Sequence, residues 1–270
     1  MAVDPGLPGR SPLILFWRQP SSKQGREPLR EDCPGRRGMF QQSNLPCGST
    51  TRFDKQNELK IRFAALWMRR VNADKPAVAE AIHDRLIDFY NQSHRHYHTL
   101  EHIRHCLREF DRAATLMDDP GAVEMAIWFH DAIYEPGAKD NEQRSAELFQ
   151  KCSNASGCTN AILQQHIHDL IMITTHREPP SQRDEQFIVD IDLSSFGLPW
   201  DQFESDGRRI RAECADMSDD EYYPGHVRFL QALRERPTFF FTAFFQKRYE
   251  RTARENIERL IMDLRMRGYY

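Results

Sequence analysis

The chain has 270 residues, 40% of them hydrophobic, so it is long enough to bury a substantial core. Its 37 basic and 40 acidic residues leave a net charge of -3, which excludes a general electrostatic attraction to nucleic acid or to an anionic membrane. Six cysteines at irregular spacings, without a CxxC pair, argue against a disulfide scaffold or zinc ribbon and favour a reducing cytoplasm. The longest apolar runs, such as 14–17 and 239–241, are far shorter than the ~20 residues of a membrane span, so no transmembrane helix is expected.

The first segment of the chain, residues 1–52, is rich in Gly, Pro, Ser and Arg and shows no sustained apolar period. Such a segment cannot bury enough surface to offset the entropy lost on ordering. It is therefore predicted to be a disordered, low-complexity tail.

Residues 53–270 are predicted to form a single all-α domain. Helical periods dominate from Asn57 onward, and no strict alternation of apolar and polar residues is long enough to indicate a sheet. The expected helices cover residues 56–71, 76–91, 99–117, 121–132, 140–151, 159–175, 183–196, 199–215, 219–235 and 240–266.

The predicted helix at 99–117 carries two different faces. Leu100, Ile103, Leu107 and Phe110 form an apolar stripe at helical spacing, and Thr99 is a suitable N-cap. A second stripe is polar and is expected to be solvated; it consists of Glu101, His105, Arg108 and Arg112. His102 borders the apolar stripe instead, so the periodicity separates it from His105.

The segment AIWFHDAIYEPG places His130 and Asp131 in surroundings that are apolar on nearly every side. An unpaired carboxylate there costs several kcal/mol, so Asp131 needs an ion pair, hydrogen-bond donors or a cation. One interpretation is a metal site. The alternative is a histidine at a helix C-terminus followed by an aspartate that caps a neighbouring element.

The metal interpretation gains from other residues of matching chemistry. In YHTLEHIRH, His98 and His102 are four residues apart and therefore share one helix face. A divalent ion accepts imidazole nitrogen together with carboxylate oxygen, so His102, His130, Asp131 and one later aspartate suffice as ligands. Asp190 and Asp192 are both available, about 200° apart on a helix, and periodicity alone does not choose between them. A lone histidine such as His102 is more often a boundary histidine with satisfied hydrogen bonds than a metal ligand.

Three stretches of the chain together resemble the HD-domain metal-dependent phosphohydrolases, whose signature is a His, an adjacent His-Asp pair and a distant Asp, all on helices. These stretches are YHTLEHI, AIWFHDAIYEPGAKDNEQRSAELF and DIDLSSFG, and the resemblance covers roughly residues 55–265. Within the superfamily they look most like a bacterial group described as predicted HD phosphohydrolases. It implies an HD-domain-like helical bundle. It also implies a metal site made of His102, His130, Asp131 and Asp192, with Asp192 preferred because Leu193 and Gly197 follow it.

The segment YHTLEH is also similar to a motif of cyclic-nucleotide phosphodiesterases, and this similarity implies that His98 is the general acid. The ordinary pKa of an imidazole suits that task. The alternative is that His98 only caps the start of the helix. Many members of the superfamily bind a second metal through additional histidines, and these are missing here, which favours a single ion. His176 or Glu142 would then contact a ligand side chain or the substrate.

A phosphate substrate also requires cations, and Lys139 and Arg177 are the candidates nearest to the motifs. Glu142 has an alternative role in stabilising the first turn of its helix. The basic residues of 247–254 alternate with glutamates, so a solvated helix face explains them equally well. Among the remaining histidines, His168 is expected to face solvent and His166, after Ile162 and Leu163, to lie on an apolar side.

These inferences predict a cytoplasmic, metal-dependent phosphohydrolase, a phosphomonoesterase or phosphodiesterase in which a divalent ion activates water and His98 and Asp131 are catalytic. The expected partner is a small phosphorylated substrate such as a nucleotide, with no nucleic acid and no membrane involved. The sequence does not select among manganese, iron, zinc, nickel, cobalt and magnesium, nor an oligomeric state. Three alternatives stay open: an HD-type iron oxygenase, a non-catalytic metal- and nucleotide-binding sensor, and a purely structural helical protein.

Overall fold

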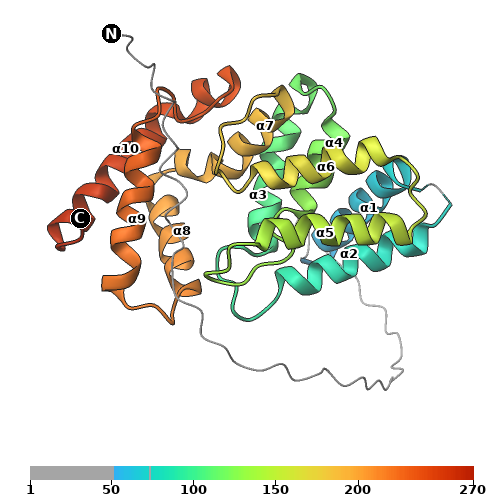
Figure 1. The fold of residues 1–270 in the computed structure, drawn as a ribbon, viewed down its shortest axis with the longest axis horizontal. Coiled ribbons are helices and arrows are strands. Elements are labelled where there is room, and N and C mark those ends of the chain that lie inside the picture. Colours follow the sequence, from blue (N-terminus) through green and yellow to red (C-terminus); the bar gives the residue numbers. More distant parts are fainter. Residues whose placement is uncertain (1–51, 73) are drawn as a thin grey trace, which may run out of the picture.

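The computed structural model describes residues 52–72 and 74–270, so the predicted disordered tail lies, except for Arg52, outside the described residues. Within the described part of the chain the regular elements are helices and no strand is present, as Figure 1 shows. The prediction of an all-α fold is therefore confirmed. None of the helices in the described ranges is both long and apolar enough to cross a membrane.

The observed helices agree closely with the predicted ones. They are α1 (Arg52–Arg70), α2 (Pro76–Tyr90), α3 (Leu100–Ala113), α4 (Pro120–Phe129), α5 (Asn141–Ala155), α6 (Ala161–Ile173), α7 (Arg183–Asp192), α8 (Trp200–Glu213), α9 (Asp219–Arg234) and α10 (Ala243–Met266). Two short 3-10 segments, η2 (Ala114–Leu116) and η3 (Leu193–Gly197), follow α3 and α7.

Three predicted boundaries were wrong in ways that matter for the site. The helix predicted to run to 132 ends at Phe129, so the His-Asp pair follows the helix instead of lying in it. The helix predicted to run to 196 ends at Asp192 and tightens into η3. The helix predicted from 240 begins at Ala243, because the Thr242 hydroxyl accepts the Phe245 amide as an N-cap.

Helix α4 is the centre of the larger group of helices. Residues 122–129 are all buried, which is the property of a helix that is apolar on every side and packs inside a protein. It contacts α1, α3, α5, α6 and α7. Around it, Phe63, Trp67, Trp128 and Phe149 form a fully buried aromatic core. The end of α4, and with it the His-Asp pair, is held in a fixed position by this packing.

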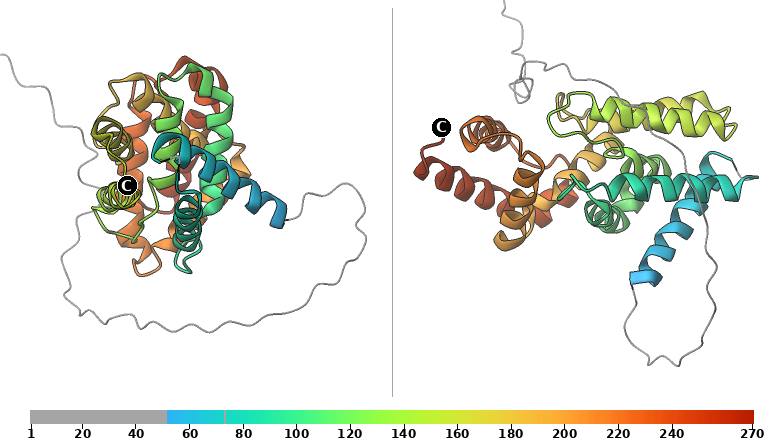
Figure 2. Two further views of the ribbon diagram at one scale, coloured as in Figure 1. Left: turned by 90° about the vertical axis from the view of Figure 1, so that its right-hand side faces the viewer. Right: turned by 90° about the horizontal axis from the view of Figure 1, so that it is seen from below.

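The C-terminal helices α8, α9 and α10 form a second group at the opposite end of the molecule from α1 and α2 (Figures 1 and 2). Helix α10 packs on η3 and α9, and α8 contacts η3. Segment η3 therefore connects the two groups. Because Asp192 directly precedes η3, the last predicted metal ligand lies where the two groups of helices meet.

Candidate metal centre

Helix ends bring the four predicted ligands together. Thr99 is the N-cap of α3, and its side chain accepts the Glu101 amide, so His102 lies in the first turn of that helix. His130 and Asp131 follow the last residue of α4, and Asp192 is the last residue of α7. Side chains at three helix ends therefore point at one place.

The four side chains are in contact with one another. The Nε2 atom of His102 lies 3.3 Å from Nε2 of His130 and 3.2 Å from Oδ1 of Asp192. The Oδ2 atom of Asp131 lies 3.1 Å from His130 Nε2 and 3.5 Å from His102 Nε2. Both imidazoles are buried, with residue exposures of 5% for His102 and 3% for His130. One ligand atom from each of His102, His130 and Asp192 lies within 4.8 Å of the other two, so these three residues could hold a metal ion.

This donor set fits a divalent ion. Ligand bonds of about 2.1 Å in a tetrahedral site separate neighbouring ligand atoms by about 3.4 Å, close to the observed separations. The Nδ1 atom of His130 donates to the Ile127 carbonyl at 2.9 Å, so in the neutral ring it is Nε2 that carries the lone pair a metal needs. Two imidazole nitrogens facing each other beside two carboxylates are the arrangement expected around a shared cation.

The cluster is strongly coupled electrostatically. Burial raises the pKa of Asp192, but hydrogen bonds from three imidazoles outweigh it and hold that pKa well below its usual range. Burial likewise raises the pKa of Asp131, and the neighbouring imidazoles, His130 foremost, reverse the shift. Both carboxylates are therefore ionised at neutral pH, which is the form that binds a metal.

Asp190 and Asp192 have separate roles in the structure. The Asp190 carboxylate accepts the backbone amides of Phe241 and Thr242 at 2.8 and 2.7 Å and the Thr242 hydroxyl at 2.7 Å. It therefore anchors the segment that begins α10, while Asp192 faces the histidines. The choice of Asp192 that the resemblance implied agrees with this geometry.

His176 holds the second oxygen of Asp192. Its Nε2 lies 2.9 Å from Asp192 Oδ2, while Oδ1 of the same carboxylate faces His102. His176 has a positive φ of 53°, a conformation that non-glycine residues seldom adopt and that concentrates at functional sites. The predicted approach of His176 to the site is thus observed, and its contact is with a ligand side chain.

His98 lies beside the cluster and is held by a residue that the sequence reasoning missed. Its Nδ1 lies 2.6 Å from Oε2 of Glu213 on α8, and its ring stacks on Tyr134 with centroids 4.1 Å apart. The other Glu213 oxygen accepts the consecutive amides of residues 96–98 at 2.8–2.9 Å. Burial lowers the pKa of His98, but Asp131 and Glu213 reverse this and raise it. The helix-capping role falls to Thr99.

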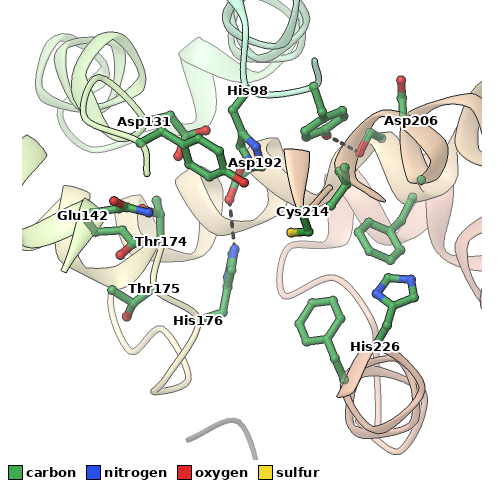
Figure 3. Close-up of a pocket in the computed structure, with 18 of the residues that line it drawn as sticks. His98, Asp131, Glu142, Thr174, Thr175, His176, Asp192, Asp206, Cys214 and His226 are labelled. Atoms are coloured by element: carbon green, nitrogen blue, oxygen red, sulfur yellow. Dashed lines mark hydrogen bonds and ion pairs between the residues drawn. The ribbon is translucent and has the colours of Figure 1, made fainter. Parts of the chain in front are cut away.

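A pocket of about 690 Å³ opens onto the cluster and is lined by His98, Asp131, His176 and Asp192, as Figure 3 shows. The other predicted substrate residues, Lys139, Glu142 and Arg177, also line it. Glu142 lies in the first turn of α5, so from one position it can both stabilise the helix and face the pocket. Burial raises the pKa of its carboxyl group. Lys139 and Arg177 are exposed at the rim, where the Arg177 guanidinium donates to the Lys139 carbonyl at 2.7 Å.

Several residues at the site carried no local signal. Glu213 lies 115 residues from His98 in the chain. Arg95 donates to the carbonyls of His98, Asp131 and Ala132 and so joins two of the motifs. Both residues are buried, where a Glu or an Arg requires a partner, but only the structure reveals that burial.

Two histidines differ from their predicted settings. His105 was expected on a solvated stripe but is partly buried, and its Nε2 donates to the Ser194 hydroxyl at 2.7 Å. Burial lowers the pKa of His105 to about 3, so the ring is neutral. His166 was expected on an apolar side, but the preceding Ile162 is 84% exposed and His166 lies 3.7 Å from Asp184. In both cases packing between helices overrides the face assigned by periodicity.

Two of the four basic residues of 247–254 are paired with glutamates of their own helix. Arg251 contacts Glu255 at 2.9 Å, and Arg254 contacts Glu250 at 2.6 Å while also donating to carbonyls of 234–237. This pattern favours the solvated-face explanation over a role in phosphate binding.

Comparison of the chain with protein-family models, with curated proteins and with solved structures finds no match. Membership of the HD-domain family therefore stays a prediction from the three motifs. The cluster of His102, His130 and Asp192 shows independently that the chain has residues that could hold a metal ion.

Proposed function

We propose that this protein is a metal-dependent phosphohydrolase of the HD-domain type that acts on a small phosphate ester. The observation that supports the proposal most is the convergence of four side chains from three distant segments at separations suited to one shared cation. His102, His130, Asp131 and Asp192 would hold the ion. A divalent ion there supplies Lewis acidity toward a phosphoryl oxygen and makes water a better nucleophile at neutral pH.

The side chains of the pocket provide the remaining functions. Glu213 occupies Nδ1 of His98, so Nε2 is the nitrogen that can donate a proton to the leaving oxygen. The raised pKa of His98 favours the protonated ring, the state that an acid needs. Asp131, ionised beside the ion, can accept the proton of the attacking water.

The charge of the pocket supports dependence on a metal. The described residues that line it include four carboxylates, Asp131, Glu142, Asp192 and Asp206, against Lys139, Arg177 and the protonated form of His98. Such a pocket disfavours a phosphate by itself. A divalent ion balances the excess of negative charge, so phosphate binding should require the metal.

The decisive experiment combines elemental analysis with a screen of phosphomonoesters and phosphodiesters. Protein purified without chelator should contain about one ion per chain, and Asp131→Ala should lose both the ion and hydrolysis. His168→Ala, outside the pocket, is the matched control and should keep both. Unchanged hydrolysis in Asp131→Ala would reject the proposal.

The acid role of His98 is tested separately by His98→Gln. This variant should keep its metal and lose about 10²–10⁴-fold in kcat, the usual contribution of a general acid. Metal-loaded wild type that binds phosphate esters without turnover would instead support the sensor alternative, and oxygen consumption by an iron-loaded protein would support the oxygenase.

A further inference from the structure

The pocket extends well beyond the metal cluster into the C-terminal helices. At about 690 Å³ it has the volume of sites that bind whole organic ligands, far more than a phosphoryl group needs. Its distant part is formed by α8 and α9, and in Figure 3 His226 marks this end, across the pocket from Glu142. We define the aromatic subsite by six of the lining residues: Phe203, Gly207, Ile210, Tyr222, His226 and Leu230.

Three of the six residues of the aromatic subsite have ring side chains: Phe203, Tyr222 and His226. Tyr222 and His226 stack with centroids 5.4 Å apart and an interplanar angle of 23°. Phe203 packs against Phe196, which also lines the pocket, with ring centroids 5.4 Å apart. Burial lowers the pKa of His226 to about 4, so its imidazole adds aromatic surface without charge at neutral pH. Ring surfaces of this kind favour a planar aromatic group in offset or edge contact.

Gly207 keeps the subsite open. It lies inside α8, where glycine costs about 1 kcal/mol relative to alanine. Its backbone does not require glycine, because its φ is not positive, and a Cβ built on it meets nothing within 4 Å. On the same face, Phe203 and Ile210 precede and follow it by one helical turn and also line the pocket. A larger side chain at 207 would therefore occupy pocket volume and disturb little else.

Asp206 adds a polar group to this apolar region. Its side chain is 19% exposed and its contact with Arg209 is long, at 3.4 Å. A carboxylate at the edge of an aromatic pocket accepts a hydrogen bond from an N–H or O–H group of a ligand, which fixes the orientation of the ring.

From these observations we infer that the aromatic subsite binds a planar aromatic group carried by the phosphate ester, and that Gly207 determines how large that group can be. The inference rests on the proposed function only for the phosphate end of the ligand. The aromatic end is argued from the walls of α8 and α9, which do not include any proposed metal ligand.

The test uses naphthol, naphthyl phosphate and methyl phosphate as probes, with dissociation constants from calorimetry. Gly207→Phe should weaken binding of naphthol and of naphthyl phosphate at least about tenfold, because its ring fills the subsite. Gly207→Ala is the matched control and should change either constant by less than about twofold. Methyl phosphate binding and metal content should be the same in both variants and the wild type.

Two further comparisons keep the test decisive. If Gly207→Phe does not fold, the wild type alone is compared on naphthyl phosphate and octyl phosphate, where tighter binding of the planar ester is expected. Equal binding of the two esters would overturn the inference of a planar ligand. A Gly207→Phe variant that folds and binds naphthol as tightly as the wild type would also overturn the inference.

The outcomes also separate this inference from the proposed function. Naphthol binding that is lost in Gly207→Phe, without hydrolysis of any ester, would support the subsite and reject the phosphohydrolase. Hydrolysis of methyl phosphate and naphthyl phosphate at rates that Gly207→Phe leaves unchanged would support the phosphohydrolase and overturn the subsite.

Discussion

At the scale of single residues, the two aspartates at the end of α7 show how neighbours in sequence acquire different roles. Asp190 is turned toward the start of α10 and accepts three hydrogen bonds. Asp192, two residues later, is bonded to His176 and faces His102. Asp190 therefore serves the packing of α10, whereas Asp192 belongs to the candidate metal centre.

Exchanging these aspartates for alanine should separate stability from metal binding. Asp190→Ala leaves three donors without their acceptor, and we expect the free energy of unfolding to fall by about 3 kcal/mol or more. The folded fraction should still bind metal. Asp192→Ala should lose the metal, as measured by elemental analysis, with a smaller change in a urea denaturation curve. The reverse pattern would show that the ligand assignment is wrong.

Glu213 is a second residue whose environment sets its chemistry. Its side chain is fully buried and accepts three backbone amides and the His98 ring. Burial raises the pKa of Glu213, but these hydrogen bonds outweigh it and lower the pKa from 4.5 to about 2. The ionised carboxylate therefore holds the motif loop at 96–98 in place.

The depressed pKa of Glu213 predicts how stability depends on pH. Its contribution is fully present above its unfolded pKa of 4.5 and is lost as the pH falls toward its folded pKa of about 2. This contribution amounts to about 3 kcal/mol at ~1.4 kcal/mol per pKa unit. Glu213→Gln should therefore be less stable than the wild type at neutral pH, and the difference in free energy of unfolding should shrink as the pH falls through this window. Urea denaturation of both proteins at several pH values in this range measures that difference. A difference that does not change with pH would contradict the role of the charge.

At the scale of elements, two glycines show how packing decides the effect of the same substitution. Gly197 in η3 lies against α10, and a Cβ there would be 2.4 Å from Cβ of Tyr249. Gly207 in α8 faces open space. Segment η3 is thus pressed closely against α10, while α8 leaves room beside the pocket.

Alanine at these two positions should change stability in opposite directions. Gly197→Ala should destabilise the protein by about 1–3 kcal/mol, the usual cost of overpacking, because η3 must move away from α10. Gly207→Ala should stabilise it by up to about 1 kcal/mol through helix propensity. Thermal melts of the two variants against the wild type measure both effects. A stabilising Gly197→Ala would mean that η3 and α10 are not closely packed.

At the scale of the whole molecule, the metal centre connects elements that are far apart in the chain. Its side chains come from the start of α3, the end of α4 and the end of α7, next to the η3 segment that supports α10. An ion bound there stabilises the folded chain because the unfolded chain cannot assemble the same ligands.

Metal addition should therefore raise the melting temperature. At an ion concentration of 100 times Kd, the stabilisation is about 2.7 kcal/mol. For a chain of this size that corresponds to roughly 5–10 °C, at about 2–4 °C per kcal/mol. Differential scanning fluorimetry of chelator-treated protein with added manganese should show this shift in the wild type and in His168→Ala, but not in His102→Ala. A wild type that does not respond to any divalent ion would favour the purely structural alternative.

Much of the fold followed from local patterns, whereas the full set of candidate ligands also needed the resemblance of three motifs to a family. Helical periods depend on residues three and four apart, so the helices could be predicted to within a few residues from the sequence alone. The His-Asp pair inside an apolar segment required a partner wherever the chain folded, because burying charge is costly. These physical constraints act over short distances in the chain, and a sequence displays them directly.

Only the tertiary structure decided which distant residues meet. Glu213 with His98, and Asp190 with the start of α10, are separated by 115 and about 50 residues, and neither pair leaves a periodic signal. The aromatic subsite likewise depends on how the fold places α8 and α9 around one pocket, so that Gly207 faces a cavity. Such contacts arise from the mutual packing of complete helices, so they are properties of the folded chain as a whole.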